Sequence, residues 1–177
     1  MKPKKLEGKL KWKVEAFGDS DHAGNTDTHL SMTGWIIYLM DAPVLWKSRA
    51  QQNVTLSLME AEYVAVSELC MEILFVRQIL EFLGEKVNYP IIINVDNQGA
   101  VFLAHNDGAS IRTQHINVRY RFVREYMENR VVKIVFVRLE ENNSDVFTKN
   151  TMMEIFHRHT GKFMVEVDDE VNEEEEG

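Results

Sequence analysis

The chain has 177 residues, 45% of them hydrophobic, which is enough to bury one core, so we expect a single domain. It has no apolar run long enough to cross a bilayer and does not open like a secretory signal, so we expect a soluble protein inside the cell. Cys70 is the only cysteine, which excludes an intrachain disulfide and, within a helical pattern, indicates core packing.

The formal net charge of -8 is unevenly distributed along the chain. Eight of the 28 acidic residues lie between Glu166 and Glu176, where there is no Lys or Arg, and the other 20 balance the 20 basic residues. A block of like charge with few apolar residues predicts a disordered acidic tail over 166–177. We expect its deletion to leave folding unchanged.

Basic residues gather in two other stretches, which can attract polyanions despite the negative net charge. An ordinary solvated surface is the alternative interpretation. The two groups are Lys2, Lys4, Lys5, Lys9, Lys11 and Lys13, then Arg112, Arg119, Arg121, Arg124, Arg130, Lys133 and Arg138.

The first half of the chain predicts an antiparallel meander followed by a long helix. Ser57 and Glu60 form a capping box, and Gly84 ends the apolar spacing that runs from Leu58 to Leu83. The three expected strands are Trp12 to Phe17, closing on a Gly18-Asp19 turn, Gly34 to Met40, and Val44 to Arg49 after an Asp41-Ala42-Pro43 turn.

The second half alternates strands and helices, which favours a mixed sheet with helices on both faces. The expected elements are a strand from Ile91 to Val95, helices from Asn97 to His105 and from His115 to Asn129, a strand from Val131 to Val137, and a last helix from near Ser144 to about Phe156.

Four acidic residues stand at places that suit a metal site: Asp19, Glu62, Asp96 and Asp145. Glu62 is the only charge on the apolar stripe of the long helix, where a carboxylate is costly unless a cation or donor meets it. Asp96 follows a strand at the end where ligands usually bind. Each aspartate also has a structural interpretation, since Asp19 suits a turn, Asp96 a helix cap and Asp145 a helix first turn.

Seven collinear motifs carry a resemblance to a known family. They are Gly18-Asp19-Ser20-Asp21-His22-Ala23-Gly24, Ser31-Met32-Thr33-Gly34, Trp46-Lys47-Ser48, Met59-Glu60-Ala61-Glu62-Tyr63, Asp96-Asn97-Gln98, His115-Ile116-Asn117-Val118-Arg119-Tyr120 and Asp145-Val146-Phe147-Thr148-Lys149. Over roughly residues 12–150, the chain resembles the ribonuclease H domain of copia-type LTR retrotransposon Pol polyproteins.

The resemblance implies an α/β, RNase H-like fold: a five-stranded mixed sheet, three antiparallel meander strands and then parallel strands, flanked by helices. It implies hydrolysis of the RNA strand of RNA–DNA hybrids with two Mg2+ ions, for which Mn2+ can substitute. Asp19, Glu62, Asp96 and Asp145 match its catalytic, metal-binding acids. The physics agrees, because clustered carboxylates repel unless hard cations neutralise them and Mg2+ prefers oxygen ligands.

The resemblance also implies partners, substrate contacts and a division of the chain. The partners are the RNA–DNA hybrid and an upstream reverse transcriptase domain, in the cytoplasm, in virus-like particles or in the nucleus. The chain would divide into a basic connection (1–11), the RNase H-like domain (12–165) and the tail (166–177). The expected substrate contacts are His115, Arg112, Arg119, Asn97 and Gln98, with local packing as the alternative for His115.

Two other functional hypotheses compete with the nuclease. A degenerate or repurposed domain that binds nucleic acid or protein without cleavage is one, because residues beside the acids depart from the family pattern. A transposase or integrase core is the other, and the acid order argues against it, because Glu62 comes second rather than last. The departures are His22, Asn25, Met59, Gly99, Gln114, Asn117, Arg121 and Asn150.

Overall fold

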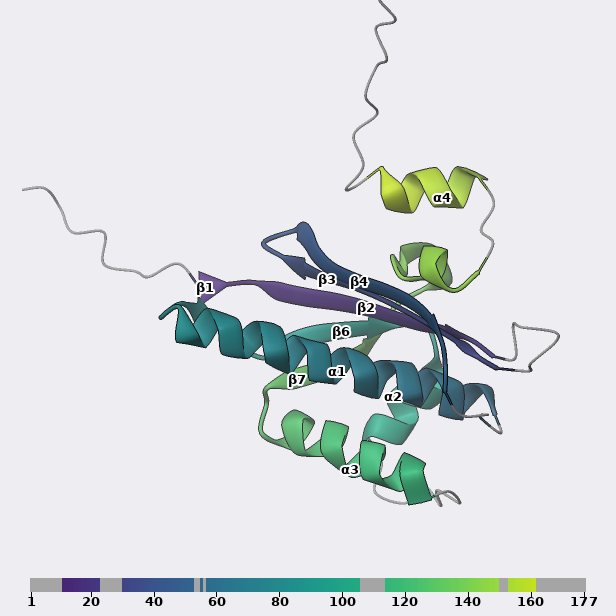
Figure 1. Ribbon diagram of the computed structural model, residues 1–177, viewed down its shortest axis with the longest axis horizontal. Helices are drawn as coiled ribbons and strands as arrows, with labels where there is room; N and C mark the ends of the chain where they lie inside the picture. The colour runs from purple at the N-terminus through teal and green to yellow at the C-terminus, as the bar shows by residue number, and fades with distance from the viewer. Residues whose placement is uncertain are drawn as a thin grey trace, which may run out of the picture.

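A five-stranded mixed sheet forms the centre of the molecule, in the order β4-β3-β2-β6-β7 (Figure 1). Strands β2, β3 and β4 pair antiparallel, whereas β6 pairs parallel with both β2 and β7. The predicted α/β architecture with a mixed sheet is therefore confirmed. The strands are β2 (Val14–Asp21), β3 (Met32–Leu39), β4 (Ala42–Ala50), β6 (Ile91–Val95) and β7 (Val132–Phe136). The computed structural model describes residues 11–22, 30–52, 55, 57–105, 114–149 and 153–161.

The first strands differ from the sequence-based expectation in their ends. Strand β2 continues through Asp21, so Asp19 lies inside the sheet opposite Gly34 rather than in a turn. The turn between β3 and β4 consists of Met40 and Asp41, both with positive φ, which is the geometry of a tight type I′ hairpin. The predicted turn over Asp41-Ala42-Pro43 is thus wrong, because Ala42 and Pro43 already pair with β3. A short parallel pair, β1 (Lys11–Trp12) with β5 (Lys86–Val87), was not predicted.

Helix α1 (Leu58–Phe82) lies across one face of the sheet and contributes much of the core. It begins as predicted, with the Ser57 hydroxyl accepting the Glu60 N–H at 3.2 Å. Gly18 lets α1 approach, since a Cβ there would lie 3.1 Å from Leu69. Cys70 is fully buried, which confirms its packing role, and burial raises its thiol pKa to about 12.

Helices α2 (Gln98–His105) and α3 (Gln114–Glu128) lie on the α1 side of the sheet, and α4 (Met153–Thr160) lies on the other (Figure 1). The expectation of one helix from Ser144 to Phe156 is wrong. Two short 3-10 turns, η1 (Leu139–Glu141) and η2 (Asp145–Phe147), precede α4. The reason is tertiary, because Thr148 and Lys149 turn toward Asp19 in the sheet instead of continuing a helix.

The two charged ends of the chain lie outside the described residues. The basic connection over 1–11, of which only Lys11 is described, and the acidic tail over 166–177 therefore stay predictions, as do the boundaries between them. Within the described part of the chain, no helix combines the length and apolarity that a membrane crossing requires.

Candidate metal centre and active site

Three aspartates converge although 126 positions separate the first from the last. Asp19 lies near the end of β2, Asp96 follows β6, and Asp145 begins η2. Strands β2 and β6 are parallel neighbours in register, with Gly18 opposite Val95, so the next residue on each strand meets at one sheet end. One carboxylate oxygen of each aspartate lies within 4.8 Å of the others.

Glu62 brings the fourth carboxylate to this cluster from α1. It lines a pocket of about 280 Å3 together with Asp19 and Asp96, whereas Asp145 lies buried beside them. The glutamate is only 3% exposed. Sequence reasoning placed it on the buried stripe of α1, and the structure confirms that burial.

The electrostatics of the cluster reflect carboxylates crowded away from water. Burial, and then the charges of Asp19 and Asp96, raise the pKa of Glu62 to about 9. Burial and the Asp19 charge likewise raise the pKa of Asp96. The surroundings therefore disfavour the ionised form of both groups, and a cation beside them would favour it.

Two buried oxygens in the pocket fit such a cation. Glu62 Oε2 and Asp96 Oδ1 accept no hydrogen bond from any residue that the structure describes. Asp96 does not cap α2, because Asn97 does so through its Oδ1, which accepts the Ala100 N–H at 3.0 Å. A donor set made only of carboxylate oxygens fits a hard divalent ion such as Mg2+.

Lys149 supplies the positive charge that the described cluster contains. Its Nζ lies 2.7 Å from Asp145 Oδ1 and 3.2 Å from Asp19 Oδ2. Burial lowers the pKa of this ammonium, but the charges of Asp19 and Asp145 outweigh that and raise it. Lys149 belongs to the last of the seven motifs, but the sequence analysis assigns it no role. Its position four residues after Asp145 is the spacing at which two side chains of a helical segment can pair.

The turn that carries Asp145 is fixed to the sheet by polar contacts. Thr148 Oγ1 donates a short hydrogen bond to Asp19, and Asn142 Nδ2 donates to Gly18 O at 3.2 Å. The Asn142 Oδ1 in turn accepts from the Ser144 hydroxyl at 2.6 Å. This turn region therefore holds Asp145 in place from both sides.

Of the expected substrate-binding residues that the structure describes, only one lines the pocket. Asn97 lines the pocket, whereas Gln98 is exposed at the start of α2 and is not among the lining residues. Arg119 donates to Ser67 Oγ at 2.7 Å, which fastens α3 to α1. Arg112 and the side chain of His115 lie outside the described residues.

A further acid of α1, Glu68, is also buried, with 8% of its surface exposed. Its carboxylate accepts from Arg49 at 3.0 Å and lies 3.7 Å from Lys47. Pairing with two cations of β4 explains how this charge is accommodated under the sheet edge.

Solved structures identify the class of fold. LC11-RNase H1, isolated from compost by a metagenomic approach, matches with a TM-score of 0.57 and 15% identity, covering 77% of this chain and 92% of that one. The same enzyme in complex with an RNA/DNA hybrid matches with a TM-score of 0.55 and 16% identity over 77% of this chain and 94% of that one. The fold is that of ribonuclease H.

Sequence relatives identify the lineage. The chain is 32% identical over 152 residues to the retrovirus-related Pol polyprotein from transposon RE2 of Arabidopsis thaliana, and 33% identical over 137 residues to that from transposon TNT 1-94 of Nicotiana tabacum. These matches cover 86% and 77% of the chain but only 10% of each relative. No family model matches. The chain is thus a homologue of Pol polyproteins from copia-type transposons, as its motifs predicted.

Proposed function

We propose that this domain is a metal-dependent endoribonuclease that hydrolyses the RNA strand of RNA–DNA hybrids. The observation that carries the proposal is the convergence of four carboxylates on a ribonuclease H fold. Three of them line one pocket and Asp145 lies beside them, and two have buried oxygens without a partner among the described residues. The structural neighbour solved with an RNA/DNA hybrid supports the substrate class. The homology to Pol polyproteins supports a role in reverse transcription beside a polymerase domain.

In the proposed reaction, each acid has a role that follows from its place. Asp19, Asp96 and Asp145 each bring one oxygen within 4.8 Å of the others, so these three aspartates would hold the metal together, with Asp19 as the ligand contributed by the central strand β2. Glu62 and Asp96 would contribute the oxygens that accept no hydrogen bond within the described ranges. Two bound Mg2+ ions would supply activation of the attacking water and stabilisation of the leaving oxygen.

The surroundings of the acids suggest how the RNA strand is held. The hydrophilic lining residues Asn97 and His22 flank the acids in the pocket and can contact the strand. A 2′-hydroxyl is both donor and acceptor, so such contacts can distinguish RNA from DNA.

Cleavage of a labelled RNA–DNA hybrid in Mg2+, Mn2+ or EDTA tests the proposal. We expect metal-dependent cleavage that Asp96→Asn reduces by more than the roughly 10–100-fold cost of losing an outer metal partner. Asp41→Asn is the matched control, because Asp41 is an exposed carboxylate in the β3–β4 turn that pairs with Lys13. A folded protein that binds hybrid and never cleaves it would overturn the nuclease and favour binding without cleavage.

A further inference from the structure

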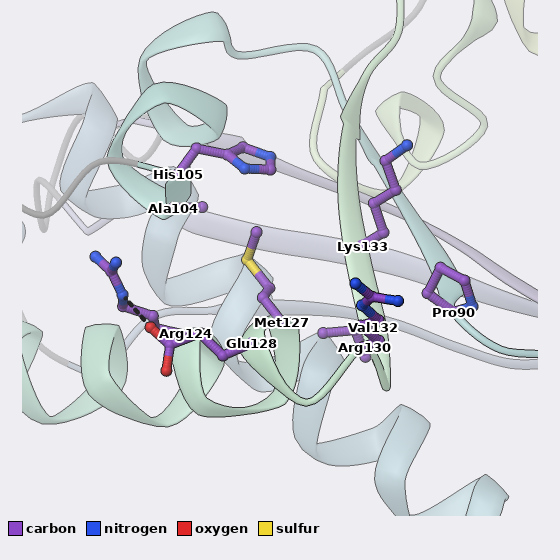
Figure 2. A pocket seen from close by; sticks show the side chains of 9 residues that line it. All are labelled: Pro90, Ala104, His105, Arg124, Met127, Glu128, Arg130, Val132 and Lys133. Carbon is purple, nitrogen blue, oxygen red and sulfur yellow. Dashed lines mark hydrogen bonds and ion pairs between the residues drawn. The ribbon is translucent and has the colours of Figure 1, made fainter.

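A second pocket, of about 380 Å3, lies where the ends of α2 and α3 meet the start of β7 (Figure 2). It is separate from the acidic cluster, since Pro90 precedes β6 whereas Asp96 follows it. The five residues of β6 put about 16 Å between those two ends. Its lining residues are Pro90, Ala104, His105, Arg124, Met127, Glu128, Arg130, Val132 and Lys133.

The lining combines an apolar floor with a cationic rim. Ala104 and Val132 are buried, and Met127 points from α3 toward α2 (Figure 2). Three rim side chains are cationic and only Glu128 is acidic. Such a pocket suits an anion that also carries a flat apolar body, and its volume falls in the range of small-molecule sites.

Two of the rim cations have no counter-ion in the part of the chain that the structure describes. Arg124 is paired with Glu128 at 2.8 Å and also donates to the Tyr120 hydroxyl. Arg130 and Lys133, by contrast, form no ion pair with any residue in the described ranges. Both charges line the pocket, where they attract an anion.

Arg130 occupies a backbone position that disfavours an arginine. It follows the end of α3 with φ 55, and the Val131 N–H closes the helix onto Tyr126 O at 2.9 Å. Glycine is the usual residue at this point, because it has no Cβ to strain the left-handed backbone. A strained arginine whose charge faces a pocket points to a function for the guanidinium.

We propose that this pocket binds a nucleotide, with its phosphate at Arg130 and Lys133 and its base and sugar against Met127. Guanidinium forms paired hydrogen bonds with phosphate oxygens, and an apolar floor accepts the face of any base. The nucleotide can come from two sources, as a free mononucleotide or as one unit of a single strand.

Calorimetric titration of the EDTA-treated protein with candidate ligands tests the pocket. EDTA keeps metal ions away from the acidic cluster during the measurement. The ligands are 5′-AMP, adenosine, inorganic phosphate and a single-stranded 12-mer. The variants are Arg130→Gly and Lys133→Gln, and the control is Arg158→Gln, which removes an exposed charge from α4 on the far side of the sheet.

We expect 5′-AMP to bind at least tenfold tighter than adenosine or phosphate. Arg130→Gly should weaken that binding at least tenfold while melting no lower than the unmodified protein, since glycine relieves the backbone strain. Much tighter binding of the 12-mer that is lost in the same variants would identify a strand as the source. Three results would overturn the proposal. The Arg130→Gly variant could bind 5′-AMP as tightly as the unmodified protein, inorganic phosphate could bind as tightly as 5′-AMP, or neither 5′-AMP nor the 12-mer could bind.

Discussion

Glu62 is a buried acid whose protonation depends on what joins it in the pocket. In the metal-free protein its pKa is about 9, against 4.5 for an ordinary glutamate. Between those values the folded chain holds a proton that the unfolded chain has released, so the free energy of unfolding falls as pH rises, by at most about 1.4 kcal/mol per pH unit.

The Glu62→Gln variant isolates this dependence. Glutamine keeps the shape and never ionises, so we expect the variant in EDTA to gain stability relative to the unmodified protein as pH rises from about 5 to about 8. Urea unfolding at several pH values measures the difference. Parallel stability curves for the two proteins would show that Glu62 ionises normally.

The Lys149 ammonium contacts Asp19 and Asp145, so it would compete with a divalent ion for the same carboxylate oxygens. Lys149→Met keeps a long, unbranched side chain and removes the ammonium group. In EDTA the variant should be less stable, by about 3 kcal/mol, because two buried carboxylates lose their cation. Its affinity for Mn2+, measured by calorimetry, should rise about tenfold because the internal competitor is gone.

Lys86→Met, which removes an exposed lysine from β5, controls for the change in net charge. Weaker Mn2+ binding by Lys149→Met would contradict competition, and would mean that Lys149 orients the acids for the metal instead.

At the scale of elements, η2 stays in place because it meets a glycine in the sheet. A Cβ on Gly34 would lie 2.5 Å from the Thr148 methyl and 2.8 Å from Phe147 Cβ. Gly34→Ala must push η2 off β3, so we expect a loss of about 1–3 kcal/mol in urea unfolding. Adding Thr148→Ser removes the nearest methyl and should restore part of that loss, because only the contact with Phe147 remains. A Gly34→Ala variant as stable as the unmodified protein would rule out the clash.

The distance in sequence between interacting residues explains which predictions of local structure succeeded. The Ser57 cap and the strand Ile91–Val95 were predicted correctly, because capping and apolar runs act within a few residues. The last helix was predicted wrongly, because the bonds of Thr148 and Lys149 to Asp19 cross 129 and 130 positions of sequence. No local pattern contains such partners.

At the scale of the whole molecule, the charge is divided between a balanced domain and an acidic end. The eight acids from Glu166 onward account for the whole net charge of -8. We expect deletion of 166–177 to leave the melting temperature unchanged, because a block of like charge with few apolar residues adds little to a core. Calorimetric melting of the two chains at the same salt concentration measures this, and a large fall would mean that the tail belongs to the fold.

The sequence by itself determined the fold class and the lineage, and it singled out the four acids that the structure brings together. Strand and helix periodicity and the order of seven motifs are properties of the chain, and they require no knowledge of its contacts. The place of Asp96 after a strand and of Glu62 on a buried stripe could be predicted for the same reason.

Only the tertiary structure decided what surrounds those acids. It put Asp19 inside a strand, buried Glu68 against Arg49 and brought Lys149 between two aspartates. It also brought the ends of α2 and α3 to the start of β7, where they line a second pocket. Each of these depends on distant segments meeting in space, and burial and charge pairing act across that space rather than along the chain.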